Sequence, residues 1–389
     1  MGGGLMQLVA YGAQDIYLTG NPQITFFKVV YRRHTNFSME SVVQTFNGNV
    51  GFGNRVTCTV SRNGDLINRM YLQVSLGELG ASNAYNHWVG HQLIKSVEIE
   101  IGGQRIDKHY GDWLHIWNEL SQTAGHYDGY KAMVSGVDAS MSASNNDLDL
   151  TPTAARELYI PLQFWFCRNP GLALPLIALQ YHEVKINIEF APLSAVCDDT
   201  TAPSFSAELY VDYVYLDTDE RRRFAQVSHE YLIEQLQFTG DEAGANSLKL
   251  NFNHPVKELI WVEKESDAKV GEYVTTYSSA LVQLNSHDRF SARKPAYFQL
   301  VQPYQHHERV PIISSGTSSD TSFDSAHINV YSFALKPEEH QPSGTCNMSR
   351  IDNAALKLTD CSSSVVKVFA VNYNVLRIMS GMGGLAYSN

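Results

Sequence analysis

The segment Val184-Lys185-Ile186-Asn187-Ile188-Glu189-Phe190 alternates apolar and polar side chains over its whole length. Successive side chains of a β-strand point to opposite faces, so the segment predicts a strand with one buried and one solvated face. The same alternation occurs at residues 55–61 and 94–101, and again beyond a charged stretch at residues 247–253 and 365–376. Half-buried strands in series are typical of antiparallel sheets that pack face to face.

The expected strands form two successive sets, separated internally by turn-forming segments such as Asn169-Pro170-Gly171. The first set comprises residues 40–46, 55–61, 70–76, 94–101, 156–166, 181–190 and 207–216. The second set comprises residues 231–239, 247–253, 258–262, 273–284, 297–301, 327–335 and 365–376. One helix is expected at residues 110–124, where apolar side chains recur at helical spacing, and it should cover the open end of a sandwich.

The length of 389 residues exceeds that of one ordinary β-sandwich, so two domains are expected. Asp217 followed by Glu220 resembles a capping box, which predicts a short helix between the two strand sets. The three arginines at 221–223 could form an anion site, but their acidic neighbours favour a solvated or ion-paired face. The expected division is an arm at 1–36, a first domain at 37–216, a linker at 217–229 and a second domain at 230–389.

The composition excludes several classes of protein. A formal net charge of -11 argues against a protein that coats nucleic acid directly. No apolar run is long enough to span a bilayer, and the amino-terminal glycine run does not resemble a signal peptide. Five cysteines without a C-x-x-C pair indicate reduced thiols in a cytosolic setting, at Cys58, Cys167, Cys197, Cys346 and Cys361.

The most ligand-like cluster is His306-His307-Glu308. On an expected strand, neighbouring side chains point to opposite faces, so only His306 and Glu308 could share one. No further ligand follows at metal-binding spacing, and Tyr181-His182-Glu183 has the same weakness. Cys167, which lies among bulky apolar residues, is expected to be a buried and inert thiol.

The sequence contains no G-x-S-x-G, H-E-x-x-H or Walker A motif. Gly381-Met382-Gly383-Gly384 follows a strand but opens no helix, so it predicts a tail or a packing corner rather than a phosphate loop. We therefore expect no catalytic, cofactor-binding or metal-binding residues, and we interpret the protein as a non-enzyme. Two alternatives remain: a two-domain cupin-like metal enzyme, and a carbohydrate-binding sandwich with Trp88, Tyr85 and Tyr277 as stacking platforms.

Several long and specific strings are spread from end to end of the chain. They are LVAYGAQD at 8–15, LTGNPQITFFK at 18–28, EIGGQRID at 100–107, PGLALPLI at 170–177, HEYLIEQL at 229–236, QPSGTCN at 341–347 with SRID at 349–352, and NVLR at 374–377 with GMGG at 381–384. These strings resemble the major capsid proteins of large icosahedral nucleocytoplasmic DNA viruses, in particular the chlorella-virus (phycodnavirus) type. The resemblance implies an all-β double jelly roll, that is, two tandem eight-stranded antiparallel sandwiches with short helices in loops.

The resemblance also implies a structural function. Three chains would form a pseudo-hexagonal capsomer, and capsomers would tile the icosahedral shell of a large double-stranded DNA virus. Expected partners are the chain itself, neighbouring capsomers, and minor capsid and penton proteins. Nucleic acid is not an expected partner, and an internal viral membrane is one only indirectly. The protein would assemble in the host cytoplasm and reside in the virion. The connecting loops are short for this family, which argues against family-like surface glycosylation.

Two segments are expected to take part in assembly. The apolar segment 172–179 is a candidate interface element between chains. The arm at 1–36 is expected to become ordered only inside the shell, since alone it has little to bury. Its Phe26, Phe27 and Tyr31 could pack on a sandwich or a neighbour, while Lys28, Arg32 and Arg33 are expected to meet acidic minor proteins or neighbouring capsomers, the only local acid being Asp15.

Overall fold

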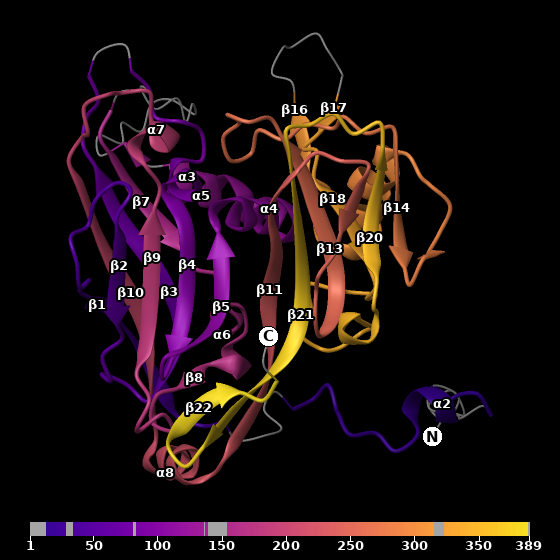
Figure 1. The fold of residues 1–389 in the computed structure, drawn as a ribbon. Helices are drawn as coiled ribbons and strands as arrows, with labels where there is room; N and C mark the ends of the chain where they lie inside the picture. The colour runs from indigo at the N-terminus through magenta and orange to yellow at the C-terminus, as the bar shows by residue number, and fades with distance from the viewer. Residues whose placement is uncertain are drawn as a thin grey trace, which may run out of the picture. The chain divides into compact units, whose positions relative to one another are not determined.

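The structure, a computed structural model, describes residues 13–28, 34–80, 83–135, 137–138, 154–314 and 323–387. The chain divides into two compact units, Met1–Phe37 and Ser38–Asn389. In the larger unit, antiparallel sheets form two sandwiches that lie side by side (Figure 1). The predicted all-β architecture is confirmed.

Two sheets enclose the core of the first sandwich. The alternation that predicted a strand at Val184–Phe190 is present, with Ile186 and Ile188 fully buried and Lys185 partly exposed. The six-stranded sheet has the spatial order β1 (Phe37–Gln44), β10 (Phe205–Leu216), β3 (Leu66–Leu76), β7 (Arg156–Pro161), β6 (Val137–Asp138), with β8 (Leu174–Pro175) beside β3. The four-stranded sheet has the order β2 (Arg55–Thr59), β9 (Val184–Phe190), β4 (Ile94–Ile101), β5 (Gln104–Tyr110).

The second sandwich encloses its own core, which includes Trp261, Val282 and Phe298. Its six-stranded sheet has the order β11 (His229–Ala243), β21 (Val365–Met379), β13 (Pro255–Lys264), β18 (Asn329–Ser332), with β19 (Cys346–Asn347) beside β13 and β22 (Met382–Leu385) beside β21. Its four-stranded sheet has the order β12 (Ser247–Lys249), β20 (Ala354–Thr359), β14 (Ser279–Leu284), β15 (His287–Asp288). A separate hairpin pairs β16 (Ile312–Ser314) with β17 (Phe323–Ser325).

The two sandwiches repeat one strand order. If the eight principal strands of each are numbered along the chain, the larger sheet has the order 1-8-3-6 and the smaller sheet 2-7-4-5 in both. This is the strand order of a jelly roll. Even the additional short strands correspond, because β8 pairs with the start of β3 and β19 pairs with the start of β13.

Short helices occupy the connections. They are α3 (Val89–Leu93), α4 (Gly111–Ser121), α5 (Ala124–Ser135), α6 (Trp165–Arg168), α7 (Leu193–Val196), α8 (Thr218–Gln226) and α9 (Gln302–His306), with single turns η1 (Pro170–Leu172), η2 (Tyr297–Val301, π-helical) and η3 (Met348–Arg350). The helix predicted at 110–124 is α4. The predicted linker helix is α8, and the Asp217 carboxylate accepts a hydrogen bond from the Thr218 amide at its start.

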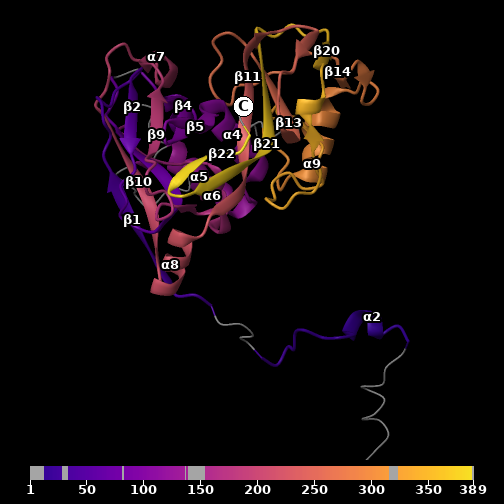
Figure 2. The same cartoon turned by 60° about the horizontal axis from the view of Figure 1, so that its bottom comes forward.

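The second strand set extends into the first sandwich. Ile233 of β11 and Leu376 and Ile378 of β21 are buried in the first core. The chain then reverses between β21 and β22 at Gly381, whose φ of +80° and close approach to the Tyr181 ring leave no space for a side chain. The glycine-rich terminus is therefore a packing corner, visible beside the first sandwich in Figure 2.

Several element predictions are wrong. Residues 297–301, predicted as a strand, form η2, because Phe298 and Gln299 both turn into the second sandwich. The strand predicted at 156–166 ends at Pro161, and α6 begins at Trp165. The strand predicted at 273–284 begins only at Ser279. Strand β5 and helix α5 were not predicted.

The arm is described by itself. It contains the short helix α2 (Ile16–Thr19), and its Phe26 and Phe27 side chains are 96% and 98% exposed. Of the other arm residues that are expected to make contacts, Lys28 is described by the structure, whereas Tyr31, Arg32 and Arg33 lie outside the described residues.

Candidate assembly surfaces

Helix α4 lies between the two sandwiches (Figure 1). It joins them through apolar side chains, since Leu114 belongs to the first core and the residues that follow contact the second sandwich. It directs four large residues at the outer face of the second six-stranded sheet, where they meet Ile260, Val262 and Phe369: Trp113, Ile116, Trp117 and Leu120. The rings of Trp113 and Phe369 are 5.6 Å apart. Because α4 is buried on all sides, the two sandwiches share it as common core.

Buried ion pairs flank this apolar contact. At the start of α4, the Asp112 carboxylate lies 3.1 Å from Lys264 Nζ and 2.7 Å from Lys367 Nζ. Burial alone would raise the pKa of Asp112, but these two ammonium groups hold it below its ordinary value. The Tyr273 hydroxyl also donates to this carboxylate. The charged α4 residue is thus held by two strands of the other sandwich.

A second buried cluster joins the sandwiches near α6. The Glu234 carboxylate on β11 lies 2.7 Å from Lys257 Nζ and 3.1 Å from the guanidinium of Arg168. Burial would raise the pKa of Glu234, yet Arg168, His340 and Lys257 lower it to about 2. Truncation of one partner in such a cluster leaves a buried charge uncompensated, so these pairs stabilise the contact between the sandwiches.

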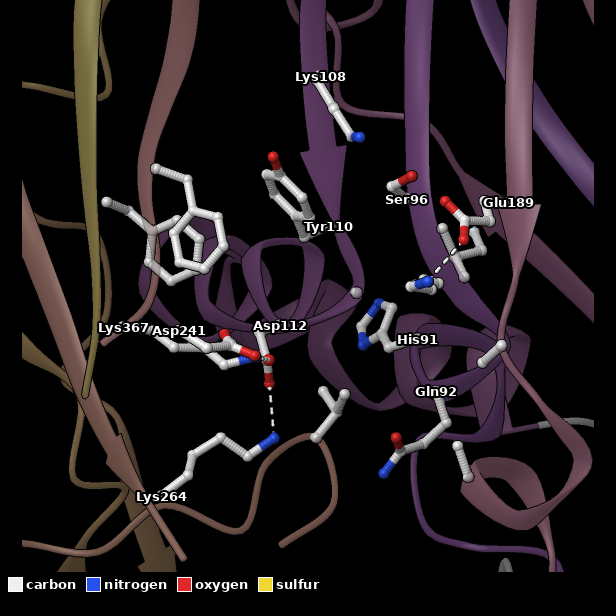
Figure 3. Close-up of a pocket in the computed structure, with 18 of the residues that line it drawn as sticks. His91, Gln92, Ser96, Lys108, Tyr110, Asp112, Glu189, Asp241, Lys264 and Lys367 are labelled. Carbon is white, nitrogen blue, oxygen red and sulfur yellow. Dashed lines mark hydrogen bonds and ion pairs between the residues drawn. The ribbon is translucent and has the colours of Figure 1, made fainter. Parts of the chain in front are cut away.

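A crevice of about 440 Å³ opens between the sandwiches above α3 and α4. Figure 3 shows Asp112 and Lys264 on one side of it and His91 and Gln92 on the other. Burial lowers the pKa of His91, so this imidazole is neutral. The lysines of the crevice are paired with carboxylates, as in the 2.6 Å pair between Lys95 and Glu189. Its charged groups thus stabilise the fold and are not arranged as an acid and base around a nucleophile.

The His306–Glu308 cluster differs from the prediction. It ends a helix, not a strand, so His307 is the buried member and Glu308 is exposed. The His307 ring lies 2.8 Å from Glu258 and 2.7 Å from Glu338, both from the second sandwich. Although burial would lower the pKa of His307, the two carboxylates raise it to about 9. The arrangement is a buried ion triad that attaches the loop carrying Glu338.

The other candidate residues have structural positions. Burial raises the pKa of the Cys167 thiol to about 12, which agrees with an inert cysteine. His182 contacts the backbone of Gly383. Tyr85 and Tyr277 are buried, so they cannot serve as surface platforms, and Trp88 packs on His91 and His115. Across the described ranges, His, Cys, Asp and Glu side chains form no group of three or more that could hold a metal ion.

The segment 172–179 is not an exposed interface element. Leu172, Leu174, Leu176 and Leu179 are buried in the first core, so that prediction is wrong. The arginine run is partly ion-paired, since Arg221 lies 3.0 Å from the buried carboxylate of Asp65. In the described part of the chain, no helix is long and apolar enough to cross a membrane.

Two other surfaces expose apolar side chains. The helical segment formed by η2 and α9 directs Leu300, Val301 and Tyr304 outward. The outer face of the first six-stranded sheet carries Met39 and Val43 of β1, and beside them the tyrosines Tyr71, Tyr159 and Tyr210. Sequence reasoning missed the helical surface because residues 297–301 resembled a strand. The spacing of the apolar residues at 297, 300, 301 and 304 is the sequence signal that could have revealed a helix.

Comparison with known proteins accounts for this architecture. Residues 25–217 match the family described as major capsid protein N-terminus, and residues 220–384 match the large eukaryotic DNA virus major capsid protein family. The chain belongs to the major capsid proteins of large eukaryotic DNA viruses. It is 69% identical to the major capsid protein of Pyramimonas orientalis virus, and the alignment covers all of both chains. The chain is therefore a structural protein of the virion capsid, and this interpretation takes the place of the cupin-like enzyme and the carbohydrate-binding sandwich.

Solved structures confirm the double jelly roll of this capsid protein. The crystal structure of PBCV-1 VP54 superimposes with a TM-score of 0.79 at 40% identity, covering 94% of this chain and 100% of that chain. The Faustovirus major capsid protein shares the fold, with a TM-score of 0.73 at 13% identity over 96% of each chain. The alignment with the Paramecium bursaria Chlorella virus 1 protein, 44% identical and complete for both chains, runs over 463 positions. That relative thus carries insertions that this chain lacks, in agreement with the expected short loops.

Proposed function

We propose that three copies of this capsid protein assemble into a pseudo-hexagonal capsomer, and that capsomers tile an icosahedral shell. The observation that carries the proposal is the repeated 1-8-3-6 and 2-7-4-5 strand order in one chain. Two equivalent sandwiches in each of three chains supply six similar blocks around one threefold axis. Sixfold-like packing then requires only threefold symmetry.

The proposed domain division supports this assembly. Strands β1 to β10 lie within residues 37–216, and β11 to β22 lie within 230–389 apart from His229, the first residue of β11. The arm at 1–36 and the linker at 217–229 complete the division. The buried α4 contact and its ion pairs hold the two sandwiches as one block, so a capsomer requires the association of three such blocks.

Neighbouring capsomers and minor capsid and penton proteins are the proposed partners, and the host cytoplasm is the proposed place of assembly. The exposed Phe26 and Phe27 and the cationic Lys28 support an arm that docks on such a partner. The formal net charge of -11 supports the absence of direct genome contact, with any internal membrane reached only through other proteins.

The protein is proposed to act without catalytic, cofactor-binding or metal-binding residues. The most ligand-like cluster supports this proposal, since His307 is engaged in an ion triad with Glu258 and Glu338. The relatives are likewise named as capsid proteins. Elemental analysis of the purified protein tests this part, and stoichiometric zinc, iron or calcium would contradict it.

Electron microscopy of the purified, negatively stained protein tests the capsomer. Averaged end-on views should show threefold symmetry and a hexagonal outline formed by six blocks. Averages that contain two blocks or four blocks would contradict the proposal, because they correspond to one chain or to a dimer.

A further inference from the structure

Helix α4 has a counterpart in the second sandwich. Both α4 and the η2–α9 segment follow the fifth principal strand of their sandwich and precede the sixth. Large residues occupy the same relative positions: Trp113, Ile116, Trp117 and Leu120 in α4, and Tyr297, Leu300, Val301 and Tyr304 in η2–α9. In α4 this spacing of three, four and seven residues places the side chains on one face. In η2–α9, Leu300, Val301 and Tyr304 are exposed, whereas Tyr297 packs against the second core.

The two helices differ in what covers that face. In α4, the four residues are buried against the outer face of the second six-stranded sheet. In η2–α9, Leu300 and Val301 are each 40% exposed and Tyr304 is 80% exposed. Within the described part of the chain, nothing buries this face, although three apolar residues share it.

The corresponding sheet face of the first sandwich is also open. The α4 helix packs where Ile260 of β13 pairs with Phe369 of β21. The equivalent third and eighth strands of the first sandwich pair Tyr71 with Tyr210, whose rings stack 5.1 Å apart on the outer face. Met39 lies on β1 at the edge of this sheet and is 47% exposed. The outer sheet face of the first sandwich thus carries the stacked Tyr71 and Tyr210 rings at the position where the second sandwich carries Ile260 and Phe369.

The charges beside the two contacts are complementary. In the contact within the chain, Asp112 of the helix meets Lys264 and Lys367 of the sheet. On the open surfaces the signs are reversed: Arg293 and Lys294 precede η2, and the sheet carries Glu157 and Glu208. Within the described ranges these charges meet neutral neighbours: Glu157 accepts a hydrogen bond from Tyr159, Glu208 accepts one from Tyr210, and the Arg293 guanidinium lies 4.0 Å from the Tyr297 ring. Opposite net charge on two open surfaces favours their mutual contact.

We infer that the η2–α9 segment of one copy docks on the outer face of the β1-β10-β3-β7 sheet of a second copy. This repeats, between chains, the contact that α4 makes within the chain. The contact is head-to-tail, so each copy offers one helix and one sheet face, and three copies close a ring. The inference rests on the proposed capsomer and identifies the surfaces that form it.

Two substitutions at exposed residues, one on each side of the contact, test the inference in the full-length protein. Tyr304→Asp places a carboxylate in the apolar helix face, and Met39→Asp does so on the sheet. Each should raise the dissociation constant of the trimer ~100-fold or more, because the charge is desolvated without a partner. Leu300→Asp is a second helix-side variant. Val227→Asp is the matched control, since Val227 is 53% exposed and lies on neither surface. Circular dichroism verifies that each variant is folded.

A head-to-tail contact makes a further prediction for mixtures. A Tyr304→Asp copy retains an intact sheet face, and a Met39→Asp copy retains an intact helix face. One copy of each can therefore form a single intact contact, between the helix of the Met39→Asp copy and the sheet of the Tyr304→Asp copy. Sedimentation of an equimolar mixture should show species of one or two chains and none of three. If wild-type protein is trimeric and either variant, or the mixture, still forms trimers, the inference is wrong. If wild-type protein is not trimeric, the proposed capsomer itself is wrong.

A charge exchange tests the polar part of the contact. Glu208→Lys should weaken the trimer ~10-fold through repulsion from Arg293 and Lys294. Combining it with Arg293→Glu and Lys294→Glu should restore most of this loss, measured by dilution in low salt. A combined variant that dissociates more readily than Glu208→Lys alone would overturn the inferred pairing.

Discussion

At the scale of single residues, His307 is the side chain whose removal should be most disruptive among the former metal-ligand candidates. Its partner Glu258 is fully buried. His307→Ala would leave that carboxylate without its cation, which should lower the free energy of unfolding by ~3–5 kcal/mol. Urea unfolding measures the loss. The matched control is the double change His306→Ala and Glu308→Ala, which should cost less than ~0.5 kcal/mol because both side chains reach solvent. Equal losses in the two proteins would contradict the buried triad.

The same residue predicts a dependence of stability on pH. The pKa of His307 is about 9 in the folded protein and 6.5 ordinarily, so its contribution is fully present below pH 6.5 and is lost as pH rises through 9. The pKa of Glu234 is about 2 and ordinarily 4.5, so its contribution is present above pH 4.5 and is lost as pH falls through 2. Urea midpoints of wild-type protein should therefore decline between pH 6.5 and 9. In His307→Gln this decline should be shallower, and parallel curves for the two proteins would contradict the assignment.

At the scale of elements, α4 should carry much of the cohesion between the two sandwiches. Trp113→Ala removes the ring that packs on Phe369 and leaves a cavity between the sheets. The expected loss is ~3–5 kcal/mol in the free energy of unfolding, measured by chemical denaturation. Phe27→Ala in the arm is the control, since its ring is 98% exposed and should contribute almost nothing. A loss below ~1 kcal/mol for Trp113→Ala would show that the sandwiches are held together elsewhere.

The amino-terminal arm should act in shell assembly and not in capsomer folding. Deletion of residues 1–23 removes α2 but none of the sandwich strands. We expect soluble trimers with an unchanged unfolding midpoint, together with a reduced yield of complete particles in electron micrographs. The double change Phe26→Ser and Phe27→Ser, which retains the length of the arm, should also reduce the yield. Normal shells from the truncated protein would contradict this role.

The elements that sequence reasoning predicted are those whose burial follows a simple period. Strands such as β9 and β4 alternate because one face lies in a core and the other in water. Strand β5 was missed because its Asp107 accepts a hydrogen bond from the Leu236 amide of the second sandwich and lies buried 2.9 Å from His109. Buried polar residues erase the alternation, and a single sequence does not reveal their partners. The η2–α9 surface was missed for a related reason, since Tyr297–Val301 is rich in residues that favour strands.

At the scale of the whole molecule, the repeated sandwich would let one chain fill two similar positions in the proposed capsomer. The contact made by α4 is completed within the chain, whereas the equivalent η2–α9 face and the first sheet face stay open. In the inferred assembly, single-chain stability and trimer formation use the same kind of contact, once within and once between copies. A closed ring of three chains would satisfy every such face without an unpaired end.

The mass of the wild-type protein in solution tests this account most directly. Sedimentation equilibrium at micromolar concentration should give a single species of three times the 43.5 kDa chain mass. The species should persist on dilution, because obligate interfaces of this kind bury on the order of 2,000–5,000 Å². A stable mass of one or two chains under these conditions would contradict the capsomer and, with it, the contact inferred between η2–α9 and the first six-stranded sheet.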